Sequence, residues 1–124
     1  MASNTYLEPG IRRWHGKVDP IAFRWEEGEH RGQFRLKEKY AFGVVTCIHY
    51  EVRGHVDSAS VSVRILRGKE IMFGVTDIEI NGVFGRNILL RFPVGLGWRI
   101  EVRCDDPDQA IQIHASVAYH AKLR

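Results

Sequence analysis

Residues 98–104, WRIEVRC, alternate strictly between apolar and polar side chains. Successive side chains of a β-strand point to opposite faces, so a period of two indicates a strand with one buried and one solvent-facing side. This is the clearest strand signal in the chain, and it predicts a sheet that covers an apolar core. The buried side is expected to carry four residues: Trp98, Ile100, Val102 and Cys104.

The same period recurs toward both ends of the chain. Residues 110–120 alternate after an acidic loop at 105–109, and residues 42–53 form the longest alternating run. In that run one side is predicted to hold Val44, Thr46, Ile48, Tyr50 and Val52. Further strands are predicted at residues 21–26, 33–37, 60–65, 71–75, 78–80, 83–84 and 88–92. No stretch shows the 3.6-residue period of a helix.

Turn residues separate these strands at short intervals. Asn81-Gly82 predicts a two-residue hairpin turn, because both turn positions favour positive φ. Short strands at spacings of about 8 to 12 residues are typical of sandwiches and barrels. We therefore predict an all-β fold, an antiparallel two-sheet β-sandwich of about eight strands with jelly-roll-like connections. An immunoglobulin fold is disfavoured, because Val102 stands where that fold places a tyrosine two residues before its second cysteine.

The first 20 residues differ from the rest of the chain. They show no sustained period and contain two prolines and two glycines. We predict an extended N-terminal arm at residues 1–20 and a β-sandwich domain at 21–124, since 124 residues suffice for one core. Aromatic, apolar and arginine side chains of the arm are candidate partner-binding residues: Tyr6, Leu7, Ile11, Arg12, Arg13 and Trp14.

Charge and cysteine content limit the classes of function. The formal charge of +3 is spread along the chain, so nucleic acid is not an expected partner. Thirteen arginines against five lysines favour a protein interface, where arginine is enriched and lysine depleted. The chain opens without a signal-peptide pattern and has no run of membrane length, which predicts a cytoplasmic, membrane-free protein. Cys47 and Cys104 are expected to be reduced.

Metal and catalytic motifs are weak or missing in the sequence. The six histidines lack ligand spacing, and His114 and His120 lie about 20 Å apart on one predicted strand. Asp105, Asp106 and Asp108 offer oxygen ligands of the kind calcium takes, but acidic turns are common and no cofactor is expected. The sequence contains no nucleophile elbow, zinc-protease motif or phosphate loop, so an enzyme is not expected.

A short chain with an arm at residues 1–20, followed by strands from Ile21 to Tyr119, resembles the small jelly-roll structural proteins of viruses and phages. That group includes capsid decoration, cement and head-fibre proteins, and the resemblance is architectural over most of the chain. It implies a non-enzymatic virion subunit that forms a homo-oligomer, with a trimer favoured, and clamps neighbouring capsid subunits with its arm as a tether.

Two alternatives remain open at this stage. The acidic loop and the three tryptophans are compatible with a carbohydrate-binding, lectin-like module, for which a glycan would be the partner. A small cupin-like metal enzyme would require several histidines to converge inside a barrel. Stabilisation by a glycan or stoichiometric bound metal would distinguish these alternatives from a structural subunit.

Overall fold

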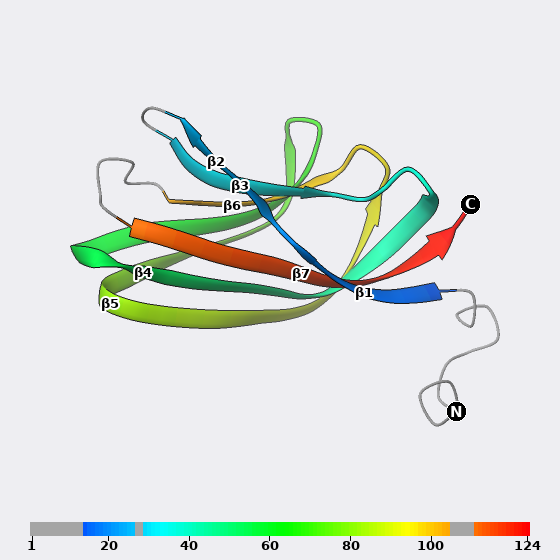
Figure 1. The fold of residues 1–124 in the computed structure, drawn as a ribbon. Coiled ribbons are helices and arrows are strands. Elements are labelled where there is room, and N and C mark those ends of the chain that lie inside the picture. The colour runs from blue at the N-terminus through cyan, green and yellow to red at the C-terminus, as the bar shows by residue number, and fades with distance from the viewer. Residues whose placement is uncertain (1–13, 27–28, 105–110) are drawn as a thin grey trace, which may run out of the picture.

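A computed structural model describes residues 14–26, 29–104 and 111–124 (Figure 1). The elements are seven strands: β1 (Trp14–Pro20), β2 (Ala22–Glu26), β3 (Glu29–Arg35), β4 (Tyr40–Arg67), β5 (Glu70–Gly95), β6 (Arg99–Cys104) and β7 (Ile111–Leu123). Every described element is a strand, and every strand pairing is antiparallel, which confirms the prediction of an all-β antiparallel fold. A search of these residues finds no helix of a length and apolarity able to cross a membrane.

The two longest strands, β4 and β5, pass through both layers of a sandwich. Residues 40–54 of β4 pair with β7 and with residues 82–95 of β5. Residues 58–67 pair with residues 70–80 of β5, and part of them also with β6. Pairing is interrupted between Gly54 and Ser58, and Figure 1 shows both strands turning at this end of the molecule. Strands that switch sheets through a bend build the corners of such sandwiches.

The connections are those of a jelly roll. With the halves of β4 and β5 counted separately, one layer has the order β1-β7-β4-β5 and the other has β3-β6-β4-β5, with β2 added beside β3. Two four-stranded sheets in this order form a jelly roll. The prediction of a jelly-roll-like β-sandwich is therefore confirmed, although continuous strands replace some of the expected short ones.

The predicted hairpin turn at Asn81-Gly82 is wrong. β5 continues through both residues, and Gly82 lies opposite Gly54 in the β4–β5 ladder. The strands bend here from one layer to the other, and a glycine at such a bend permits the change of direction. The true β4–β5 turn lies at Gly68, whose φ of +63° favours glycine. The dipeptide therefore marks a corner rather than a reversal.

Part of the predicted N-terminal arm is a strand of the sandwich. Residues 14–20 form β1, an edge strand that pairs with β7 from Trp14 opposite Lys122 to Pro20 opposite Ser116. Sequence pattern missed this strand because its exposed edge position relaxes the apolar alternation: Val18 is 69% exposed. Proline is also tolerated at the end of an edge strand. Residues 1–13 of the predicted arm lie outside the described residues.

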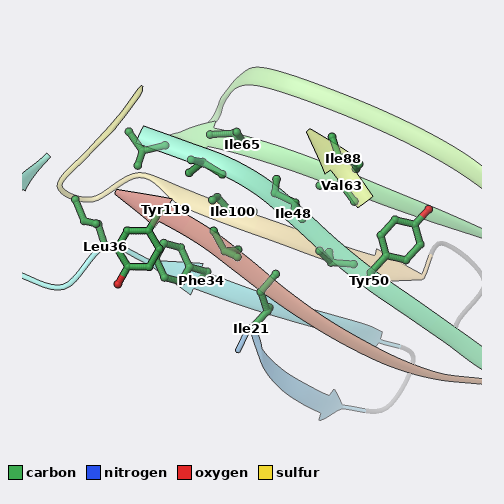
Figure 2. Packing of buried hydrophobic residues seen from close by; sticks show 14 of the residues in the cluster. Ile21, Phe34, Leu36, Ile48, Tyr50, Val63, Ile65, Ile88, Ile100 and Tyr119 are labelled. Atoms are coloured by element: carbon green, nitrogen blue, oxygen red, sulfur yellow. The ribbon is translucent and has the colours of Figure 1, made fainter. Parts of the chain in front are cut away.

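The core lies between the two layers and is built from the alternating apolar residues. Ile48, Tyr50 and Val117 of the first layer and Val63 and Ile100 of the second are all buried (Figure 2). Trp98 packs against this cluster and is half-buried. Aromatic rings pack at one end of the core: the ring centroids of Phe34 and Tyr119 are 5.1 Å apart, and those of Tyr40 and Tyr119 are 6.2 Å apart.

One irregularity in β4 corrects the predicted faces. Pairing shifts register between Val45 and Cys47, so Val45 and Ile48 are both buried although they are three residues apart. The side chain of Thr46, predicted to share the Ile48 face, donates a hydrogen bond from its hydroxyl to the Ala118 carbonyl at 3.2 Å. A β-bulge of this kind adds one residue and reverses the alternation on one side of it. Val45 thus replaces Val44 in the core.

A buried hydroxyl ties the edge strand β1 to the core. Tyr119 is 1% exposed, and its hydroxyl donates to Asp19 Oδ2 at 2.5 Å. Burial first, and then the hydrogen bond and negative charge of Asp19, raise the pKa of Tyr119 above that of a free tyrosine. The folded protein therefore keeps this phenol protonated at a pH at which the unfolded chain ionises.

The raised pKa of Tyr119 predicts a loss of stability at alkaline pH. Because the folded pKa lies above the unfolded one, stability is intact below pH ~10 and falls above it, by up to about 1.4 kcal/mol per pH unit. Tyr119→Phe should cost about 1 kcal/mol at pH 7 and flatten the decline. Urea unfolding of both proteins from pH 7 to 11 measures this difference. Parallel stability curves would contradict the role of Tyr119.

Candidate functional site

The outer side of the second layer is dense in arginine. Three neighbouring strands, β3, β6 and the second half of β4, place polar side chains on this side, together with the buried Leu66, while the alternate apolar residues fill the core. Among the described residues these side chains include five arginines, which we call the arginine face: Arg31, Arg35, Arg64, Arg99 and Arg103.

Strand register brings these arginines together in pairs. Arg31 lies opposite Arg103, and Arg35 lies opposite Arg99 across the β3–β6 ladder. Side chains directly opposite each other in an antiparallel ladder have Cβ atoms about 5 Å apart, and like charges there are destabilising. The two pairs are separated by four residues, about 13 Å along the strands. The sheet therefore holds two cationic pairs at a fixed spacing.

One acidic side chain lies at the centre of the arginine face. Glu101 is opposite Gln33 on β3 and Arg64 on β4, and its side chain is only 6% exposed. Its Oε2 atom is 3.8 Å from the Arg31 Nη1 atom. Five arginines around one carboxyl group leave a formal charge of about +4 on the described part of this face, more than the +3 of the whole chain. Glu101 offsets part of the repulsion and leaves an excess positive charge.

The arginine face has an apolar border where β4 turns into β5. Ile71 is 55% exposed, and Arg67 stacks over the Trp98 ring at 5.7 Å from its centroid. The guanidinium group of Arg99 donates to the Gly68 carbonyl at 3.1 Å, which holds that group at this border. Guanidinium groups on a rigid sheet present planar pairs of donors that match carboxylates and phosphates. Arginine beside exposed apolar side chains is also the composition of protein interfaces.

The outer side of the first layer differs from the arginine face. A row crosses its four strands through Val18, Ala118, Cys47 and Leu89, each opposite the next in the ladder. Beside this row, His49 Nδ1 and Asn87 Oδ1 are 2.7 Å apart, and His49 Nε2 lies 3.7 Å from Glu51 Oε1. Cys47 and Cys104 are free thiols, and burial raises the pKa of Cys47.

The histidines within the described ranges do not gather into a metal-binding group. His114 and His120 are exposed on the outer side of β7, as their alternation predicted. In the part of the chain that the structure describes, no three His, Cys, Asp or Glu side chains lie together as metal ligands. Two surface hollows of about 350 and 290 Å³ lie beside β1, and Asp19 in the larger one is engaged by Tyr119 and Lys37.

Most sequence-predicted site residues lie outside the described residues. These are Tyr6, Leu7, Ile11, Arg12, Arg13, Asp105, Asp106 and Asp108. Trp14 is placed by its backbone only, as the first residue of β1. The sequence analysis missed the arginine face because its members are distant in the chain. A usable signal existed, since Arg35, Arg64 and Arg99 all fall on the polar side of an alternating strand.

Fold and site together define a jelly-roll β-sandwich with one strongly basic sheet face. No protein-family model matches the chain, and no curated protein sequence matches it. Among solved structures, it is similar to dimeric latent PorU from Porphyromonas gingivalis, with a TM-score of 0.51 and 9% identity over 89% of this chain. The match spans 13% of the PorU chain, so it describes the fold of one part of that protein. Chicken MD-1 complexed with lipid IVa aligns at a TM-score of 0.29 with 12% identity, covering 88% of this chain and 99% of MD-1.

Proposed function

We propose that this protein is a non-enzymatic structural subunit that assembles with copies of itself and docks on a larger protein lattice, as virion decoration and cement proteins do. In this proposal the arginine face is the docking surface, and its partner is an acidic protein surface such as that of a capsid subunit. The observation that carries the proposal is the cluster of five arginines around the buried Glu101 on three paired strands.

The spacing of charges favours carboxylates over a nucleic-acid backbone. The central row between the two arginine pairs holds Gln33, Glu101 and Arg64, so the positive charge is not a continuous track. Single-stranded nucleic acid is usually held on sheets by exposed aromatic rings, and on the described part of this face the polar positions hold none. Separate arginine pairs match separate carboxylates, each bound through two parallel hydrogen bonds.

Binding of poly-L-glutamate, a polymer of carboxylates, tests the docking surface. We expect Arg35→Gln and Arg64→Gln each to weaken binding by about tenfold, the range of a charge-assisted hydrogen bond, and to reduce its salt dependence. Arg91→Gln is the matched control, because Arg91 is exposed on the outer side of the first layer. Fluorescence anisotropy at several salt concentrations measures all three.

Two results would reject this docking surface. Equal losses of affinity for Arg91→Gln and Arg64→Gln would mean that binding depends on net charge and that the arginine face is not the binding site. Tighter binding of mixed-sequence duplex DNA than of poly-L-glutamate at the same salt concentration would assign the face to nucleic acid instead.

A further inference from the structure

Strand β5 forms an open edge of both layers. In the described part of the chain its only ladder partner is β4, along a strand that runs from Glu70 to Gly95. An edge of this length presents unpaired backbone donors and acceptors that can pair with another strand. β1 and β2, which form the opposite edges, are much shorter.

The most exposed large apolar side chain in the described residues lies on this edge. Leu89 is 80% exposed, and it ends the row that runs from Val18 through Ala118 and Cys47 across the first layer. Contiguous apolar surface, such as that of Leu89 with Cys47 and Ala118 beside it, is typical of a surface that a partner covers. A second copy of the same edge would bring a second Leu89 to this point.

We propose that β5 pairs with β5 of a second copy, antiparallel, about a two-fold axis at Leu89. Leu89 then faces Leu89 of the second copy, Asn87 faces Arg91, and Ile88 faces Leu90. No two like charges are opposite in this register, which favours pairing. The new ladder ends where Pro93, which has no N–H group, faces Gly85. A two-fold contact of this kind is self-complementary, as homodimer interfaces require.

The two-fold pair has a consequence for docking. Side chains that are opposite each other in an antiparallel sheet lie on the same side of it. The first layers of the two copies therefore turn their outer sides in the same direction. Both arginine faces then face the other way and can bind one acidic lattice together, which strengthens attachment through effective concentration. The inference rests on the proposed function for this bivalent role, whereas the pairing itself rests on the β5 edge alone.

Disulfide trapping tests the register directly. Leu89→Cys in a Cys47→Ser background should form a covalent dimer on mild oxidation, because Cα atoms of opposed residues lie about 4.5 or 5.5 Å apart and both separations suit a disulfide. Removing Cys47 prevents an internal bond, since Cys47 is opposite Leu89 within one chain. Arg91→Cys in the same background is the matched control and should form no covalent dimer, because the two copies of residue 91 lie about 13 Å apart.

A mixture of Asn87→Cys and Arg91→Cys chains should form a covalent mixed dimer, which neither variant forms alone.

Leu89→Glu should weaken dimerisation by about tenfold, as measured by light scattering. Val18→Glu on β1 is the exposed apolar control, and circular dichroism checks that both variants fold. A trimer without Leu89→Cys trapping, or equal trapping at residues 89 and 91, would overturn the pairing. The monomeric Leu89→Glu variant should still bind poly-L-glutamate. Failure of the β5 pairing can therefore be told apart from failure of the arginine face as the docking surface.

Discussion

Replacing Glu101 by glutamine is expected to lower the free energy of unfolding by about 2 kcal/mol, because a nearly buried carboxyl group loses its contact with Arg31, whose side chain is 32% exposed. The Glu101 side chain is 6% exposed, lies 3.8 Å from Arg31 and is opposite Arg64. Without the Glu101 carboxyl group, Arg31 loses this negative charge, and the repulsion between Arg31 and Arg64 is less offset. The same variant should bind poly-L-glutamate more tightly, because the face becomes more positive.

Urea unfolding at low and high salt measures the loss of stability. At about 1 M salt the screening length is near 3 Å, so the cost of Glu101→Gln should shrink as the arginine repulsion is screened. Glu70→Gln is the matched control: Glu70 is 60% exposed at its side chain and pairs with Arg67 at 2.8 Å. An exposed pair of this kind contributes about 1 kcal/mol or less. Equal costs for Glu70→Gln and Glu101→Gln would show that Glu101 does not hold the face together.

Replacing Asp77 by alanine is expected to cost about 3 kcal/mol, because it leaves a buried hydroxyl and a guanidinium without their shared acceptor. The Tyr50 hydroxyl donates to Asp77 Oδ2 at 2.5 Å, and Arg86 donates to the other carboxylate oxygen. Tyr50 is fully buried. The hydrogen bond to Asp77 is the main reason that the pKa of Arg86 is raised.

The position of Asp77 explains why its loss should affect the whole sandwich. Asp77 lies in the first half of β5, opposite Val61, whereas Arg86 lies in the second half, opposite Tyr50. The cluster of Tyr50, Asp77 and Arg86 therefore links the two halves of β5 on either side of the corner. Networks of this kind hold a bend in one arrangement only when all members are satisfied.

A double-mutant cycle separates the network from simple truncation. Asp77→Ala should cost less in a Tyr50→Phe background, with a coupling of about 1 to 2 kcal/mol between the two residues. Urea unfolding of the four proteins measures the coupling. Additive costs would mean that the Tyr50–Asp77 hydrogen bond contributes nothing beyond the two side chains taken separately.

Local sequence patterns determined where strands lie and which side of most strands is buried. Residues 98–104 are the best example, since Ile100, Val102 and Cys104 are all buried between the layers. A period of two is a property of the strand itself, so no tertiary information is needed to recognise it. The turn at Gly68 also has a local cause, because a positive φ favours glycine wherever it occurs.

Only the tertiary structure decided the corner, the bulge and the arginine face. The local sequence of Asn81-Gly82 predicts a hairpin turn. In the structure Gly82 pairs with Gly54 across the β4–β5 ladder, so the dipeptide is part of a bend between the layers. The bulge near Thr46 depends on how β4 meets β5 and β7. The arginine face needs the β3–β6 and β4–β6 registers, which bring Arg35 and Arg64 beside Arg99 and Glu101 from distant parts of the chain. Register is a relation between strands, and a single strand's alternation carries no record of which neighbour it will meet.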